Sequence, residues 1–161
     1  MSTSRVDQLD ARILRLFATE PRVGVLEASR RLGVARGTVQ ARLDRLSDRG
    51  VVIGWGPDID PAALGYPVTA FVTMEIRQRG HDEIGQRLAE IPEVLEVHTT
   101  TGSSDLLCRI VAKDNTDLQR VIDTVVDVDG VQRTSTVIAL ATQVPHRVMP
   151  LVAQATSGHA H

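Results

Sequence analysis

The sequence predicts an α+β protein built from two parts of different character. Apolar residues recur with a helical period over the first 50 residues, whereas strand-like runs alternate with two helical segments from Pro67 onward. A stretch rich in Gly, Pro and Asp separates the two patterns. The formal net charge of −2 divides unevenly, because residues 1–60 hold ten arginines and eight acidic residues while residues 61–161 hold eight basic and twelve acidic residues. We therefore expect two domains with different tasks.

The first part predicts three short helices, over the segments VDQLDARILRLFATEP, VLEASRRLG and ARGTVQARLDRLSDRG. Either Asp7 or Asp10 can cap the first helix. Gly33 ends the second and Gly50 ends the third, since glycine readily adopts the left-handed conformation found after helices. Three short helices with a Gly-containing turn between the second and third indicate a helix-turn-helix domain, which we assign to residues 1–50.

Residues 51–66 are expected to form a hinge strand and a linker. The apolar run from Val51 to Trp55 is strand-like, and Pro57 and Pro61 break the chain after it. This strand has no obvious partner within a small helical domain, and an uncovered strand edge is a liability. We therefore expect residues 51–59 to pair with the same segment of a second copy.

Residues 67–145 are expected to fold as a ferredoxin-like domain with the order β-α-β-β-α-β. Strands are predicted over residues 68–76, 94–102, 105–112 and 131–140, and helices over residues 81–91 and 115–128. Two helices cover only one face of such a sheet, yet Phe71 and Leu107 give the other face apolar character. We expect a second chain to cover that face; the alternative is a modestly apolar exposed face. Residues 146–161 are interpreted as a C-terminal tail with a flexible end.

The third helix predicts a DNA-binding surface. Val39, Leu43 and Leu46 fall on its core face, and a stripe beside them carries arginines at the spacing i+4, i+7 and i+11 from Thr38. Arginines sorted in this way suit double-stranded DNA, where they bind phosphates and guanine, and the N-terminal end of this helix is the part that enters the major groove. The expected DNA-binding residues are Arg36, Thr38, Gln40, Arg42, Arg45 and Arg49. The alternative is the solvated basic face of an ordinary helix.

The segment TTTGSSD, residues 99–105, is the best candidate for a small-molecule site. Gly102 lets the backbone turn and present N–H groups to a carboxylate, and Asp105 can accept an ammonium group. Together these groups match an α-amino acid. The alternative, which the residues by themselves favour, is a hairpin turn in which Asp105 bonds its own backbone.

The sequence gives little support for catalysis, metal binding or membrane association. No catalytic triad, Cys-His pair or phosphate-binding Gly loop is present, so we expect no enzyme and no cofactor. The five histidines are too dispersed to predict a metal site, and Cys108, the single cysteine, fits a buried apolar position in a reduced, cytoplasmic protein. No apolar run is long enough to span a bilayer, and we expect no membrane partner.

The segments LDARILRLFATEPRV and RRLGVARGTVQARLDRLSDRGVVIGWGPDIDPAALG resemble the N-terminal half of the Lrp/AsnC family of transcription regulators. PEVLEVHTTTGSSDLLCRIVAKD and GVQRTSTVIAL resemble the effector-sensing domain of that family. The resemblance implies a DNA-binding domain, a hinge strand, and a sensor domain that dimerises through its sheet and assembles into octamers or similar rings. It implies an amino acid as effector, bound by residues of the turn and of a neighbouring subunit's last strand: Thr100, Gly102, Ser103, Ser104, Asp105, Thr134 and Thr136.

Two positions depart from the family pattern. Ala35 stands where a capping Ser is usual, which costs the third helix about 1 kcal/mol. Ser104 stands where an aromatic residue is usual in the sensor turn, and the larger pocket this implies points to a bulky or aromatic amino acid.

The sequence therefore predicts a sequence-specific DNA-binding transcriptional regulator whose oligomeric state or DNA binding responds to an amino acid or a related small effector. Two alternatives remain. One is an architectural protein that wraps DNA with little sequence specificity, and the other is an amino-acid-sensing regulatory subunit of a metabolic enzyme.

Overall fold

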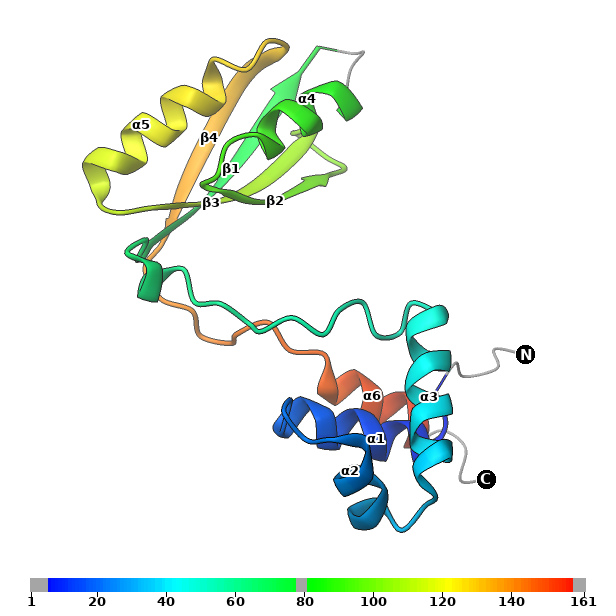
Figure 1. Cartoon of the computed structure of the whole chain (residues 1–161). Helices are drawn as coiled ribbons and strands as arrows, with labels where there is room; N and C mark the ends of the chain where they lie inside the picture. Colours follow the sequence, from blue (N-terminus) through cyan, green and yellow to red (C-terminus); the bar gives the residue numbers. More distant parts are fainter. Residues whose placement is uncertain (1–5, 78–80, 158–161) are drawn as a thin grey trace. The chain divides into compact units, whose positions relative to one another are not determined.

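The computed structural model describes residues 6–77 and 81–157. The chain divides into two compact units, which Figure 1 shows. Unit 1 comprises residues 1–57 together with residues 144–161, and unit 2 comprises residues 58–143. The two-part organisation expected from the charge and periodicity patterns is thus present, but the C-terminal segment belongs to the first unit.

Unit 1 contains the three predicted helices, α1 (Gln8–Thr19), α2 (Val25–Leu32) and α3 (Arg36–Asp48). Their apolar faces meet in a small core that includes Ile13, Ala28, Val39 and Leu43. Gly33 ends α2 with a positive φ of 69°, which favours glycine and sets the turn into α3. The helix-turn-helix arrangement predicted from the sequence is confirmed.

The helix ends differ in how well they are capped. Asp7 is the N-cap of α1, and it forms a reciprocal capping box with Asp10. Ala35, the N-cap of α3, makes no side-chain hydrogen bond, as expected from the missing hydroxyl. The start of α3 therefore lacks the side-chain cap that stabilises the start of α1.

The hinge segment and the tail differ from expectation. Within the described chain, residues 51–60 contain no strand, because a strand needs a partner for its backbone groups and this segment finds none in a single copy. Pairing with a second copy stays a prediction. The expected tail contains α6 (Met149–Ser157), which packs on α1, and the Gln8 side-chain amide donates to the Thr156 carbonyl at 2.7 Å. The flexible end predicted for the tail falls on residues 158–161, outside the described residues.

Unit 2 has the predicted β-α-β-β-α-β order: β1 (Val68–Ile76), α4 (His81–Ala89), β2 (Val94–Thr99), β3 (Leu106–Ala112), α5 (Asn115–Val126) and β4 (Val131–Ala139). The strands form one antiparallel sheet in the order β2-β3-β1-β4. A short 3-10 helix, η1 (Ala62–Leu64), precedes β1. The ferredoxin-like fold predicted from the sequence is confirmed.

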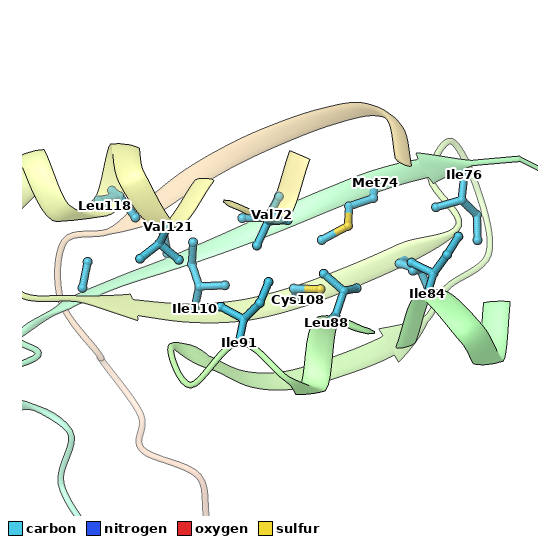
Figure 2. Packing of buried hydrophobic residues seen from close by; sticks show 14 residues of the cluster. Val72, Met74, Ile76, Ile84, Leu88, Ile91, Cys108, Ile110, Leu118 and Val121 are labelled. Atoms are coloured by element: carbon cyan, nitrogen blue, oxygen red, sulfur yellow. The ribbon is translucent and has the colours of Figure 1, made fainter. Parts of the chain in front are cut away.

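The core of unit 2 lies between this sheet and its two helices. Figure 2 shows Val72 and Met74 of β1 and Ile110 of β3 facing Leu88 of α4 and Val121 of α5. These five side chains are fully buried, because period-two alternation sends the strand residues to the helix-covered face, where the helix residues meet them. The opposite face carries Phe71 on β1 opposite Val137 on β4, with exposed fractions of 39% and 65%.

Gly130, in the corner before β4, is constrained by both conformation and space. Its φ is 102°, and a Cβ added there would lie 2.7 Å from Cδ1 of Ile84. We expect Gly130→Ala to lower the free energy of unfolding of unit 2 by about 1–3 kcal/mol, measured by urea denaturation. Gly85→Ala is the matched control. Gly85 lies inside α4 with open space around its Cα, so alanine there should raise stability slightly. Equal stability of the two variants would contradict this assignment.

Candidate DNA-binding and effector-binding sites

The six residues predicted to bind DNA fall into two groups on α3. Arg36, Thr38, Gln40 and Arg49 are exposed. Arg36 lies in the first turn and Arg49 at the C-cap, and neither has an ion pair among the described residues. Gln40 donates from its side-chain amide to Asp44 one turn later, at 2.8 Å.

Arg42 and Arg45 form the second group, and they bind the start of α1. The Arg42 guanidinium contacts the Asp7 carboxylate and donates to Asp10 Oδ1 at 3.0 Å. Arg45 Nη2 donates to the two Asp10 oxygens at 2.9 and 2.8 Å. Asp10 is 1% exposed, so its charge is almost entirely removed from water. Two guanidiniums compensate that burial, and the half-buried arginines are therefore part of the helix packing.

This cluster also shifts the ionisation of its members. Partial burial acts to raise the pKa of Asp7, but the backbone N–H of Asp10 and the Arg42 guanidinium more than offset it and lower that pKa below 3.8. The carboxylates of Asp7 and then Asp10 raise the pKa of Arg42. A carboxyl pKa that is lowered in the folded state stabilises the protein above about pH 4. That stabilisation is lost as the pH falls through the pKa of the folded state. These two pKa shifts both favour the charged forms of Asp7 and Arg42.

The DNA-binding role predicted for this arginine stripe stays a prediction, and the structure adds a contact with α1 for two of its members. Its arrangement beside the core face is as expected, but two of its four members have carboxylate partners within the chain. Helical periodicity could locate Arg42 and Arg45 beside the core, but it could not show that the start of α1 lies next to them. The capping pattern of Asp7 and Asp10 was visible in the sequence, although their second role as ion-pair partners was not.

The turn of residues 99–105 is closed by its own backbone and side chains. The Thr100 N–H donates to the Asp105 carbonyl at 2.8 Å, and the Thr100 hydroxyl donates to the Ser104 carbonyl at 2.8 Å. Gly102 has a φ of 109°, so the glycine predicted to let the chain turn does so. Asp105 Oδ2 accepts the backbone N–H of Ile76 on β1 at 2.8 Å. Its carboxylate thus anchors the turn to a neighbouring strand rather than to the turn itself.

A cavity of about 330 Å³ lies beside this turn, at the lower end of the range for small-molecule sites. Residues of the turn, of β1 and of β4 line it: Thr73, Met74, Glu75, Ser103, Ser104, Arg133, Thr134 and Ser135. Three predicted effector residues, Ser103, Ser104 and Thr134, thus meet at one cavity within a single chain. Thr100, Gly102, Asp105 and Thr136 do not line it.

Sequence reasoning missed the charged members of this lining. Glu75 and Arg133 lie directly opposite each other on β1 and β4. They are far apart in the chain, and only the register of the sheet brings them together. Of the two residues predicted on β4, Thr134 is the one that lines the cavity next to Arg133.

The remaining side chains give no evidence of a metal site or a reactive cysteine among the described residues. The described residues contain no cluster of three or more His, Cys, Asp and Glu side chains able to hold a metal ion. Burial raises the pKa of the Cys108 thiol to about 11, which leaves it protonated and a poor nucleophile at neutral pH. No helix in the part of the chain that the structure describes is long and apolar enough to cross a bilayer.

Comparison with known proteins accounts for both units. Residues 6–47 match the AsnC-type helix-turn-helix domain, and residues 69–149 match the Lrp/AsnC ligand binding domain. The HTH-type transcriptional regulator FL11 of Pyrococcus horikoshii is 30% identical over 91% of this chain and 97% of its own length.

Two solved structures extend this likeness to the fold. E. coli AsnC matches with a TM-score of 0.80 at 26% identity, covering 90% of this chain and 99% of that chain. A feast or famine regulatory protein from M. tuberculosis, complexed with L-methionine, matches with a TM-score of 0.78 at 28% identity, covering 88% of this chain and 97% of that chain.

The ion pairs of α3 generate a prediction about stability. Arg42→Ala removes one of the two cations that compensate the buried Asp10 while Arg45 remains, so we expect the free energy of unfolding of unit 1 to fall by about 1–3 kcal/mol. Arg36→Ala, on the same helix but exposed, should change it by less than about 0.5 kcal/mol. Thermal and urea unfolding followed by helical circular dichroism measures both. A stability loss shared equally by the two variants would remove the structural role of Arg42.

Proposed function

The chain belongs to the Lrp/AsnC family of transcriptional regulators, and on that premise we propose that it is a sequence-specific DNA-binding regulator whose DNA binding or oligomeric state responds to an amino acid. The observation that carries this proposal is the exposed start of α3. It follows the Gly33 turn and presents Arg36, Thr38 and Gln40 without burial. This is the geometry with which a recognition helix enters a major groove.

Two groups of α3 residues have different tasks in this proposal. Arg36, Thr38, Gln40 and Arg49 contact DNA, where arginine side chains bind phosphates or guanine. Arg42 and Arg45 hold α3 against the start of α1 and so fix its orientation. Division of the stripe in this way differs from the simpler expectation that every arginine of the stripe binds DNA.

Assembly is the second part of the proposal. Phe71 and Val137 leave an apolar strip on the helix-free face of the sheet, and Ile53 and Trp55 leave apolar side chains on the hinge segment. A second copy that covers both surfaces buries this apolar area and pairs the hinge backbone. We propose a homodimer that assembles further into an octamer or a similar ring, in the cytoplasm.

The amino-acid response rests on the cavity beside the 99–105 turn. Ser103 and Ser104 of the turn and Thr134 of β4 line this cavity, and the match to a ligand-binding domain covers all three. Of the relatives described above, the M. tuberculosis protein is complexed with L-methionine. We propose that a free amino acid occupies the equivalent region here. A regulator of this kind also explains the different charge of the two parts of the sequence.

An architectural DNA-wrapping protein is the second candidate, because phosphate contacts from α3 serve both functions. Footprinting on genomic fragments separates the two. A specific regulator protects discrete sites that survive competitor DNA, whereas an architectural protein protects DNA with little dependence on sequence.

The first functional prediction concerns direct contacts to DNA. Arg36→Ala and Arg49→Ala should each weaken DNA binding and reduce the log–log dependence of affinity on salt by about 0.9 for each phosphate that the variant no longer binds. Their folding stability should stay within about 0.5 kcal/mol of wild type. Arg87→Ala, an exposed arginine of α4 in unit 2, is the charge-matched control. Fluorescence anisotropy at several salt concentrations measures the effect, and unchanged affinity and slope in both α3 variants would contradict the assignment.

The second prediction concerns Asp105. Asp105→Asn should keep the fold, because the amide oxygen can still accept the Ile76 N–H that the carboxylate accepts now. If Asp105 accepted a ligand ammonium group, the amide would lose a charge-assisted hydrogen bond and effector affinity would fall by roughly 10- to 150-fold. Because Asp105 does not line the cavity, we expect effector affinity to change little instead. Isothermal titration calorimetry of wild type, Asp105→Asn and the exposed control Asp129→Asn decides this. Equal affinity in wild type and Asp105→Asn is the expected result and limits Asp105 to anchoring the turn, whereas a loss of roughly 10-fold or more would show that Asp105 binds the ammonium group.

A further inference from the structure

The cavity beside the 99–105 turn contains two opposite charges on adjacent strands. Glu75 on β1 faces Arg133 on β4, and Arg133 Nη1 lies 4.0 Å from Glu75 Oε1. That separation is too long for a hydrogen bond. Their side chains are 47% and 79% exposed, and both line the cavity. The pair therefore leaves hydrogen-bonding capacity on each group for a third molecule.

We propose that Arg133 binds the carboxylate of the effector and that Glu75 binds its ammonium group. The inference rests on the proposed function, because it concerns how the same cavity recognises an amino acid. A guanidinium binds a carboxylate through two parallel hydrogen bonds, and a carboxylate accepts hydrogen bonds from an ammonium group. An amino-acid zwitterion carries both charges on its α-carbon, so one molecule can satisfy both protein groups.

Glu75 is better placed for the ammonium group than Asp105 is. One oxygen of Asp105 already accepts the Ile76 N–H, and Asp105 does not line the cavity. No side-chain hydrogen bond at 3.5 Å or less involves Glu75 among the described residues, and its side chain lies at the cavity. Asp105 then supports the site by fixing the turn that carries Ser103 and Ser104.

The rest of the lining selects the side chain of the effector. Five residues that carry a hydroxyl group line the cavity from the two strands and the turn: Thr73, Ser103, Ser104, Thr134 and Ser135. Hydroxyls both donate and accept hydrogen bonds, and a polar side chain satisfies them whereas an aromatic ring does not. The effector class is accordingly a neutral amino acid with an amide or hydroxyl side chain, rather than the bulky or aromatic one that the absence of an aromatic at Ser104 suggested.

The test uses calorimetry on the full chain with the twenty amino acids. The tightest binder is then compared with its carboxamide, which lacks the carboxylate, and its N-acetyl derivative, which lacks the ammonium group. We expect Arg133→Gln to weaken binding of the amino acid at least 10-fold but to change binding of the carboxamide little. Glu75→Gln should weaken binding of the amino acid by a similar factor and should leave binding of the N-acetyl derivative unchanged. Arg133→Lys should recover part of the loss.

Arg77→Gln is the matched control, because Arg77 is exposed at the end of β1 and does not line the cavity. Wild-type affinity in Arg133→Gln and Glu75→Gln would overturn this inference and leave the proposed regulator intact. Tightest binding of an aromatic amino acid would overturn the assigned class. A wild-type protein that binds specific DNA but no amino acid would overturn both this inference and the proposed response, whereas failure to bind DNA would contradict the regulator itself.

Discussion

The buried carboxylate of Asp10 is the constraint on which the geometry of the first unit depends. Isolated, such a charge is too costly to remove from water, so the fold is compatible only with arrangements that bring cations to it. Arg42 and Arg45 do so from α3, and this fixes which face of α3 turns towards α1. The apolar core of this unit is small, and apolar contacts are not directional. The ion pairs therefore fix the rotation of α3 about its own axis, which the apolar core alone does not fix.

The dependence of α3 on these ion pairs explains how far the sequence could predict the DNA-binding surface. The period of Val39, Leu43 and Leu46 predicted the buried face of α3 correctly, because burial follows directly from periodicity. Whether the neighbouring arginines are exposed or paired depends on where the start of α1 lies. Their ion pairs are tertiary contacts between residues more than 30 positions apart. A local pattern holds no information about such a contact.

The second unit shows the same division between local and long-range information. Strand-like runs predicted its four strands and their order along the chain closely, and Gly102 predicted the turn. The pairing of Glu75 with Arg133 follows from the register of β1 with β4, with a bulge after Glu75, and neither is encoded in a short segment. The turn and Thr134 were therefore predicted as parts of an effector site, with Thr134 from a neighbouring subunit, while the charged residues beside them were found only in the folded chain.

The return of the chain to α6 affects the order in which the protein is made. Residues 58–143 of the second unit lie between the two segments that form the first. At about 5–20 residues per second, a ribosome needs several seconds to pass through that stretch. During this interval α1, α2 and α3 have been synthesised without the helix that packs on α1. The DNA-binding unit is therefore completed only after the whole sensor sequence has been translated, and the docking of α6 on α1 is the last step in the folding of that unit.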